Sequence, residues 1–427
     1  MKENNSASRR DFMALSGAAL AAGTLIPNQL SANENAKQQT TDSLFSSPVI
    51  LQNPTENSIT AAWTLSNFAT GWIEWGTAPD KLDQKACGAK YGLKPYSNRV
   101  IQVTINGLKP NTTYFYRAAA SAVDFRGAYD IRPARETEFT KVLSFTTPGP
   151  NANSASFAVV NDTHHVQDVM ALEFAKIREL KPDYTFWNGD SVNSVEGHEM
   201  LLKNVIFPAN CEVANDHPLL FVRGNHDTRG HWARYYPEYF TPWKQDDPEF
   251  DDLGYSFVVR HGDLAMIGLD TGEDKPDFRK EWGGLAEFEP YIAKQGEWLK
   301  KVLNSEKVKT AKFVVAFCHI PLFDPRPGAN PGTLETGHSA WKKLGADFWG
   351  PALQEAGVQL VVAAHVHRHR IDEPTPERCW TQITGGGCSM KDATVIHGAI
   401  VDGKLKVTTY FAATGEVLSE RTFEPRA

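Results

Sequence analysis

Six apolar runs in this sequence each end in residues that can bind a metal ion or transfer a proton. In the clearest case, residues 219–222 lead through Arg223 and Gly224 into Asn225-His226-Asp227. The other five runs lead into further His and Asp residues: Asp162, His164 and His165; Asp190; Asp270; His319; and His365 with His367. Such a run is typical of a buried strand that delivers ligands at its C-terminal end. We therefore expect one metal site assembled from several strand ends.

The residue types indicate a site for two divalent transition-metal ions. Two such ions about 3.5–4 Å apart share a bridging carboxylate and hold a water or hydroxide between them. Imidazole and carboxylate ligands suit Mn, Fe, Zn or Co, and the sequence has no Cys-x-x-Cys spacing that would indicate a thiolate zinc site. In an extended segment, residues i and i+2 point the same way. Asp162 with His164, and His365 with His367, can therefore each bind one ion together.

The order of these motifs resembles that of the calcineurin-like metallophosphoesterase superfamily over residues 155 to about 400. The motifs are Asp-x-His, Gly-Asp, Gly-Asn-His-Asp, a single His, and Ala-His-x-His. The resemblance implies two ligand sets that share Asp190: Asp162, His164, Asp190 and His367 for one ion, and Asn225, His319 and His365 with Asp190 for the other. It also implies that His226 faces the scissile ester and protonates the leaving oxygen or stabilises the transition state. Asp227 would orient His226.

Two positions depart from related patterns. Ala364 stands where the superfamily usually has Gly, and it is still small. Purple acid phosphatases carry an iron-binding Tyr three residues after the Gly-Asp aspartate, and this position is Asn193 here. They also have Gly where this chain has His164. We therefore expect no tyrosinate-bound iron and no purple colour.

Several residues near these motifs have two interpretations. His165 and Arg229 are predicted to contact substrate; Arg229 and Arg223 suit bidentate binding of phosphate oxygens, and each could instead form a structural ion pair. Aromatic residues within 232–243 and 270–282 could line the site or pack in the core. Ordinary polar roles are expected for His198, His338, His369 and His397, and a turn between strands for Gly385–Gly387.

Residues 1–32 are interpreted as a signal peptide. Ser8-Arg9-Arg10-Asp11-Phe12 precedes an apolar run, 14–26, that is too short to span a membrane comfortably. The motif resembles the twin-arginine export signal, which implies a periplasmic or secreted protein. Polar residues 33–47 read as a linker, and we expect no transmembrane segment in the mature chain.

Residues 48–148 are predicted to form an all-β domain. Short alternating runs are separated by turn residues, as at 58–64, 71–75, 99–105, 107–117 and 143–148. The Gly-Leu-x-Pro-x-Thr-x-Tyr run from Gly107 and the closing Phe-x-Thr-Pro resemble a fibronectin type III domain. Such a domain before a metallophosphoesterase resembles the N-terminal domain of purple acid phosphatases.

Residues 155–427 alternate strand and helix patterns and are predicted to form an α/β domain. Helices are expected over 166–180, which Pro182 terminates, and over 290–303. β-structure is expected to return at 379–384, 394–401 and 406–411. The metallophosphoesterase resemblance implies an α/β/β/α layered sandwich.

Composition limits the function. The 427 residues suffice for two cores, and a net charge of −7 argues against nucleic-acid binding through a basic face. Cys318 is predicted to be a small core residue, and a disulfide between Cys379 and Cys388 is left open.

The sequence therefore predicts an exported phosphoesterase that hydrolyses small phosphate monoesters or diesters. Attack would come from a metal-bound hydroxide, and His226 would assist the leaving group. The alternative is a surface-binding protein with a fibronectin-like module and an inert hydrolase domain. Metal content distinguishes the two, and the sequence assigns no oligomeric state.

Overall fold

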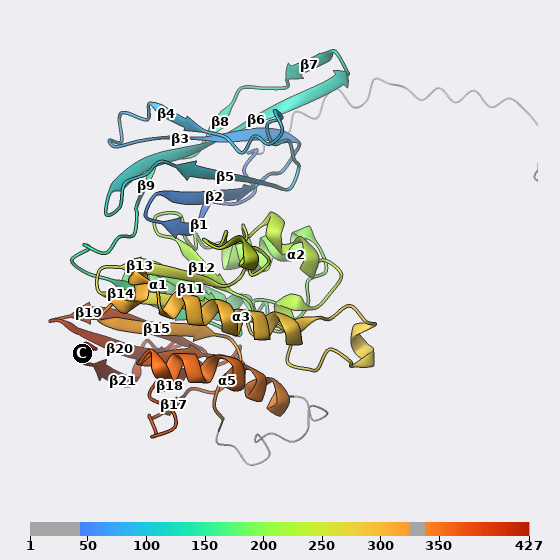
Figure 1. The fold of residues 1–427 in the computed structure, drawn as a ribbon. Helices are drawn as coiled ribbons and strands as arrows, with labels where there is room; N and C mark the ends of the chain where they lie inside the picture. The colour runs from blue at the N-terminus through green and yellow to red at the C-terminus, as the bar shows by residue number, and fades with distance from the viewer. Residues whose placement is uncertain (1–42, 325–337, 427) are drawn as a thin grey trace, which may run out of the picture. The chain divides into compact units, whose positions relative to one another are not determined.

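Two mixed β-sheets packed face to face form the centre of the computed structural model, which describes residues 43–324 and 338–426 (Figure 1). The first sheet has nine strands, in the spatial order β21 (Val417–Phe423), β20 (Lys404–Phe411), β19 (Thr394–Val401), β10 (Ser156–Val160), β11 (Tyr184–Asn188), β12 (Leu219–Val222), β1 (Ile50–Thr55), β2 (Ser58–Thr64) and β5 (Val100–Asn106). The second has six, in the order β13 (Phe257–His261), β14 (Leu264–Leu269), β15 (Phe313–Cys318), β16 (Leu360–Ala363), β18 (Thr381–Thr384) and β17 (Arg370–Asp372).

The strands at the centre of each sheet run parallel. β10, β11 and β12 pair in parallel, as do β14, β15, β16 and β18. Apart from β18, their sequences are mostly apolar, and all these strands are almost entirely buried because both faces are covered, which is the usual property of parallel sheets. Parallel strands bring their C-terminal ends to one edge, so the residues that follow them collect there.

Helices cover the two outer faces of this pair of sheets. Helix α1 (Gln167–Leu180) covers the nine-stranded sheet, where its Met170, Phe174 and Ile177 pack with Trp187. Leu201 of α2 (His198–Leu201) belongs to the same core cluster. Helices α3 (Phe288–Leu303) and α5 (His338–Glu355) cover the six-stranded sheet, and α4 (Glu306–Lys309) follows α3. Four layers result, as the sequence predicted.

The predicted ends of the first helix are close to the observed ones. Lys181 adopts a left-handed conformation with φ of 50°, and its amide donates to the Ile177 carbonyl. This ends α1 directly before Pro182, which cannot continue a helix. The second predicted helix, 290–303, begins two residues earlier, at Phe288.

The N-terminal β-structure is a sandwich. Its second sheet contains β4 (Gln84–Ala86), β3 (Ala69–Gly76), β6 (Thr113–Gly127) and β7 (Asp130–Pro133), with β8 (Glu138–Phe139) and β9 (Leu143–Thr146) also paired to β6. Trp63, Tyr116 and Phe145 are buried between this sheet and β1, β2 and β5.

The nine-stranded sheet runs from the sandwich into the α/β part of the chain. β1 pairs in parallel with β12 at Gln52 and Leu219. The side chain of Gln52 donates to the Tyr239 carbonyl at 2.7 Å and accepts from the Thr241 amide at 3.0 Å. The sequence did not predict β1, because Asn53 and Pro54 interrupt its alternation.

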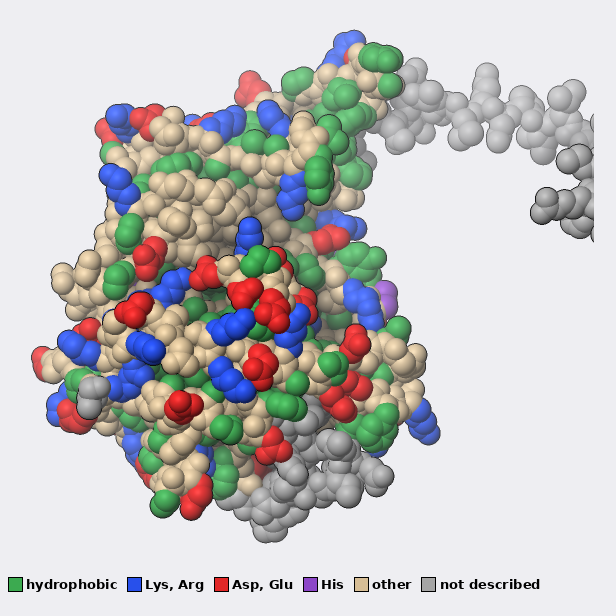
Figure 2. All heavy atoms as spheres, in the orientation of Figure 1, with side chains coloured by type: hydrophobic (Ala, Val, Ile, Leu, Met, Phe, Trp, Pro, Cys, Tyr) green, Lys and Arg blue, Asp and Glu red, His purple; other side chains and the backbone are tan. Residues whose placement is uncertain are grey.

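All five cysteines are free thiols, so Cys379 and Cys388 do not form the disulfide that the sequence left open. Cys318 is fully buried in the core, and burial raises the pKa of its thiol to about 12. Among the described residues, no helix is both long and apolar enough to cross a membrane. On the face seen in Figure 2, acidic and basic side chains are interspersed.

Candidate metal centre

The C-terminal ends of five strands from both sheets contribute to one cluster of polar side chains. β10, β11 and β12 of the nine-stranded sheet lead to Asp162, His164, Asp190 and Asn225. β15 and β16 of the six-stranded sheet lead to His319, His365 and His367. The structure therefore brings together all seven residues that the sequence predicted as ligands.

A first group consists of Asp162, His164, Asp190 and His367. Each offers one ligand atom, and these atoms lie within 4.8 Å of one another. His164 Nε2 lies 3.1 Å from His367 Nε2 and 3.6 Å from Asp190 Oδ2. His367 Nε2 lies 3.3 Å from Asp162 Oδ1. Two carboxylates and two imidazoles thus converge on one point.

A second group consists of Asp190, His319 and His365, whose ligand atoms also lie within 4.8 Å of one another. His365 and His367 thus lie in different groups, and their spacing does not place them on one ion as expected. Asp190 Oδ2 is 3.1 Å from His319 Nε2. The side-chain oxygen of Asn225 lies 3.0 Å from His365 Nδ1, which adds a neutral oxygen ligand beside this group. Asp190 belongs to both groups, which is the geometry that a bridging carboxylate requires.

Hydrogen bonds outside the cluster fix the direction of the imidazoles. The Asn188 carbonyl accepts from His319 Nδ1 at 2.9 Å, which leaves Nε2 as the ring nitrogen that faces Asp190. Asn193 Oδ1 accepts from His164 Nδ1 at 2.7 Å in the same way. Histidines that bind metals usually donate their second ring nitrogen to such a partner.

Buried polar atoms within the cluster lack hydrogen bonds in the described part of the chain. They are Asp162 Oδ1, His319 Nε2 and the side-chain nitrogen of Asn225. Burying a polar atom without a partner is costly unless another ligand satisfies it. The first two are potential metal-ligand atoms that point into the cluster. The carboxylate, imidazole and amide set thus fits divalent transition-metal ions.

The backbone at these positions is strained. Six residues of the cluster and its edge have φ between 43° and 69°: Asp162, His164, His165, Asp190, His365 and His367. Non-glycine residues rarely adopt this region, and such strain collects at functional sites. Gly189, with φ of 84°, adds a second constraint, because a Cβ there would collide with the His319 ring.

The charges in the cluster are strongly coupled. Burial alone would raise the pKa of the Asp190 carboxyl, but the imidazoles of His319 and His226 lower it below its usual value. Burial lowers the pKa of His319, but Asp190 and Asp162 more than reverse this effect and raise it to about 10. Burial and the neighbouring His319 lower the pKa of His365 to about 3. Without metal, a protonated His319 therefore balances the carboxylates.

His226 lies at the edge of the cluster. Its ring stands edge-on to that of His164, with centroids 4.7 Å apart, and its backbone amide donates to Asp190 Oδ1. The Asn193 carbonyl accepts from its Nδ1 at 2.8 Å. Its Nε2 accepts from Arg229 Nη1 at 2.9 Å. The imidazole is therefore fixed on both sides next to the proposed ligands.

Asp227 contacts backbone groups, and among the described residues its carboxylate does not contact the His226 ring. Its Oδ2 accepts from the amides of Asp190 and Gly224, and its Oδ1 accepts from Ser191. We expected Asp227 to orient His226. In the structure the Asn193 carbonyl does so, and Asp227 holds the loops that follow β11 and β12.

The two arginines near this motif form ion pairs. Arg229 binds Glu273 through Nε and Nη2 at 2.8 and 2.6 Å, and it also contacts Asp274 at 2.8 Å. Arg223 pairs with Asp270 at 2.6 Å. His165 Nε2 lies 3.1 Å from the side-chain nitrogen of Asn193.

Sequence reasoning singled out Asn193 only for the Tyr it replaces. It missed Glu273 and Asp274. The one signal for the acidic pair is its position shortly after the apolar run that ends at Asp270.

Two of the four histidines that were expected to have ordinary polar roles have ordinary hydrogen-bond partners. His198 bonds the Tyr239 hydroxyl, and His369 lies between the Thr384 carbonyl and the Ser419 hydroxyl. His397 lies within β19, and the side chain of His338 is outside the described part. Three of the six aromatics of 232–243 belong to the core: Tyr236, Tyr239 and Phe240 pack with Phe221.

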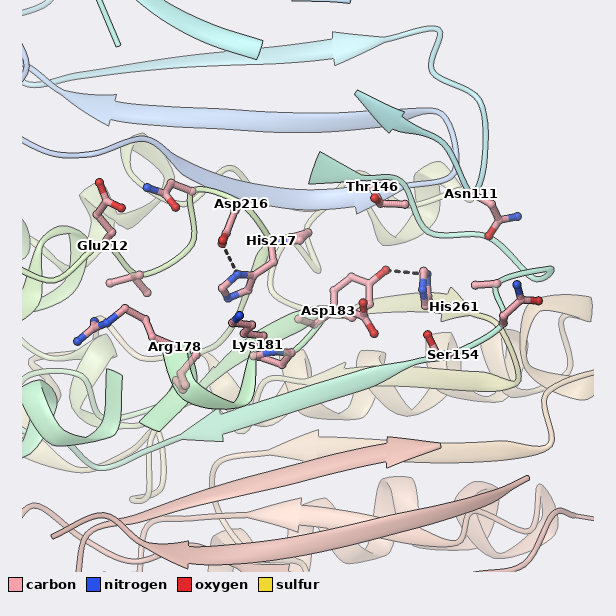
Figure 3. Close-up of a pocket in the computed structure, with 18 of the residues that line it drawn as sticks. Asn111, Thr146, Ser154, Arg178, Lys181, Asp183, Glu212, Asp216, His217 and His261 are labelled. Atoms are coloured by element: carbon pink, nitrogen blue, oxygen red, sulfur yellow. Dashed lines mark hydrogen bonds and ion pairs between the residues drawn. The ribbon is translucent and has the colours of Figure 1, made fainter. Parts of the chain in front are cut away.

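A cavity of about 830 Å³ lies at the opposite ends of the strands (Figure 3). Ser154, Tyr184 and Pro218, which line it, lie at or just before the starts of β10, β11 and β12. None of the predicted site residues lines it. The strand-end cluster, and not this cavity, is therefore the candidate functional site.

Comparisons with known proteins agree with this arrangement. Residues 155–369 match the family model of calcineurin-like phosphoesterases, and residues 47–147 match that of the purple acid phosphatase N-terminal domain. Purple acid phosphatase 22 of Arabidopsis thaliana is 25% identical over 323 residues, which are 72% of this chain and 62% of that protein. The chain thus spans less than two thirds of that relative.

Solved structures show the same fold. A purple acid phosphatase, PPD1, from yellow lupin (Lupinus luteus) seeds superposes with a TM-score of 0.62 at 15% identity, over 88% of this chain and 74% of that chain. The structure of PhoD superposes with a TM-score of 0.56 at 13% identity, over 89% and 90% of the two chains. The predicted fold class and the predicted resemblance are both confirmed.

Proposed function

Because the chain belongs to the calcineurin-like phosphoesterase family, we propose that it is a metal-dependent hydrolase of small phosphate monoesters or diesters. The observation that carries this proposal is the position of Asp190, which lies in both groups of potential ligands. A single carboxylate shared in this way is what a dinuclear hydrolase requires. The intact ligand set also favours an active enzyme over a binding module with an inert domain.

Each group would hold one divalent ion, of Mn, Fe, Zn or Co. Asp162, His164, Asp190 and His367 would bind the first, and Asn225, His319 and His365 would bind the second together with Asp190. When bound, such ions lower the pKa of a water and neutralise charge on the phosphate oxygens. Asn188 and Asn193 keep the two imidazoles beside Asp190 in the orientation that binding needs.

His226 would face the departing oxygen of the ester. Its Nδ1 donates to the Asn193 carbonyl and its Nε2 accepts from Arg229, so Nε2 could carry a proton to the ester only after Arg229 Nη1 has turned away from it. Arg229 Nη1 already contacts Nε2, while Glu273 and Asp274 hold the rest of the guanidinium. Arg229 would therefore contact the substrate near its leaving group. His165, which lies beside the side chain of Asn193, would contact the substrate from there.

The site lacks the tyrosinate ligand of an iron centre, because Asn193 occupies that position. Its side chain hydrogen-bonds His164, and an amide gives no charge-transfer band with iron. The metal-loaded protein should therefore be free of the intense visible band of such iron.

We also propose export through the motif at Arg9 and Arg10, which lies outside the described residues. Replacing both by Lys should retain the precursor in the cytoplasm, and undiminished export would refute the assignment.

The decisive experiment combines metal analysis with a panel of chromogenic monoesters and diesters, assayed with Mn, Zn and Fe. We expect close to two transition-metal ions per chain and hydrolysis that a chelator abolishes. A fully folded protein that binds no transition metal under any of these conditions would exclude the proposal.

A further inference from the structure

A second cavity, of about 750 Å³, lies beside the proposed leaving-group side of the centre. Arg229 and Glu273 both line it, and Arg229 reaches His226 Nε2 at 2.9 Å. Thr228 also lines it, and its hydroxyl donates to the carbonyl of the proposed ligand Asn225. The cavity is therefore separated from the imidazole of His226 by the side chain of Arg229, which lines the cavity and contacts that imidazole.

One wall of this cavity is apolar and comes from the segment between β14 and α3. The side chains of Trp282, Leu285 and Phe288 form it. Leu285 is 73% exposed, so its side chain is accessible from the cavity. The Trp282 indole nitrogen donates to the Pro276 carbonyl at 3.1 Å, so its polar edge is satisfied, and Lys275 Nζ lies 5.8 Å from the centroid of its ring.

The charged groups around the cavity are mostly paired. Arg223 is bound to Asp270, Glu281 to Arg279, and His231 to Glu196. Among the described residues, Arg234 is the cation of the lining for which no ion pair is found. An apolar wall with one available cation suits a flat ring that carries electronegative atoms, because both aromatic stacking and cation–π contact are then possible.

We propose that this cavity receives the leaving group and that the preferred substrates are phosphoesters of aromatic or heteroaromatic alcohols. This inference rests on the proposed function of the metal centre. Hydrolysis breaks the bond between phosphorus and the alcohol oxygen; water oxygen bonds to phosphorus, and the alcohol leaves with a proton. Trp282 and Leu285 would then act on substrate choice and leave the chemistry at phosphorus unchanged.

The test compares Trp282→Ala and Leu285→Ala with the control Phe278→Ala. Phe278 lies in the same segment and is 64% exposed, but it does not line the cavity. For each protein, kcat/KM is measured with 1-naphthyl phosphate and with methyl phosphate. We expect kcat/KM for 1-naphthyl phosphate to fall about tenfold in each cavity variant, which is the effect of one lost stacking or apolar contact. The kcat/KM for methyl phosphate should stay unchanged. The control should change neither value.

A binding measurement makes the test independent of turnover. Calorimetric affinities for 1-naphthylmethylphosphonate and methylphosphonate should show the same tenfold difference in the cavity variants, with the metal-loaded protein. Equal losses for both ligands, or none for either, would overturn the assignment of the cavity while leaving the phosphoesterase in place. Absence of all hydrolysis by metal-loaded wild-type protein would instead reject the proposed function, and the phosphonate affinities would still decide the cavity.

Discussion

Asp190 is the residue on which both proposed metal positions depend. Its Oδ2 lies between His319 Nε2, at 3.1 Å, and His164 Nε2, at 3.6 Å. Its Oδ1 accepts from the His226 amide. Asp190→Asn removes a negative charge between two cations, so we predict loss of metal and of activity together, whatever the leaving group. Metal analysis of the purified variant measures this directly.

His226→Ala is the matched variant, because His226 lies beside the ligand groups and outside them. We predict near-normal metal content and a loss in turnover of about 10²–10⁴-fold, which is typical of lost acid assistance. The loss should shrink for nitrophenyl esters, whose leaving groups scarcely need a proton. If the variant is purified without metal, or is equally impaired on good and poor leaving groups, His226 is a ligand or an orienting group.

His319 makes metal binding depend on pH. Burial lowers its pKa, but Asp190 and Asp162 raise it to about 10 in the metal-free protein. A metal ion needs the neutral imidazole, so below pH 10 it must displace a proton. Affinity should therefore rise with pH, by about tenfold per unit between pH 7 and 10 if one proton is released. His365 adds nothing to this dependence, because its pKa is lowered to about 3.

The measurement is calorimetric titration of metal-free protein with Mn or Zn at pH 7, in buffers that differ in ionisation enthalpy. At least about one proton should be released per chain. Binding without proton release would mean that His319 is already neutral, and the coupling to the two carboxylates would be wrong.

At the scale of elements, Asp227 connects the ends of β11 and β12. Its buried carboxylate accepts from the amides of Gly224, Asp190 and Ser191. Asp227→Asn turns one acceptor oxygen into an amide nitrogen that faces these donors. We predict a loss of about 1–3 kcal/mol in the free energy of unfolding, the usual cost of leaving a buried hydrogen-bond donor without its acceptor.

Metal content of Asp227→Asn should fall with stability, because the loop that carries Asp190 loses its support. Thermal unfolding and metal analysis check both effects. If the variant keeps its stability and its metal but loses turnover, Asp227 acts on His226 after all, as the motif suggested.

The sequence predicted the strands of this site from periodicity, and the resemblance to metallophosphoesterases implied which of the polar residues after them are ligands. Apolar runs such as 219–222 specify buried parallel strands, and parallel strands must bring their C-terminal ends together. It could not predict the partners of His226, because these depend on loops. The left-handed conformations of residues such as His164 and His365 have no signature in composition. Likewise, Arg229 meets Glu273 only because the segments after β12 and β14 approach one another.

At the scale of the whole described chain, one sheet joins the sandwich to the α/β layers. β1 belongs to the sandwich through β2, and it pairs with the α/β part of the same sheet through β12. Ile50 packs in the same core cluster as Trp187 and Phe221. The Tyr116 hydroxyl, from the sandwich core, donates to the Asn215 carbonyl at 2.6 Å. The sandwich therefore shares both backbone pairing and core with the part of the chain that carries the site.

We predict that the chain unfolds in one cooperative transition, with equal calorimetric and van't Hoff enthalpies. Residues 149–427 alone would leave the β12 edge unpaired and the surface beneath Ile50 exposed, which favours aggregation. Scanning calorimetry of the full chain is the measurement, and Gln52→Ala is the sharper probe. Loss of its two hydrogen bonds should lower the single transition temperature without splitting it. Two outcomes would contradict this prediction: two separate transitions in the wild-type chain, or a soluble 149–427 fragment with full metal content. Either one would show that the sandwich folds independently and that the β1–β12 pairing contributes nothing to the stability of the site.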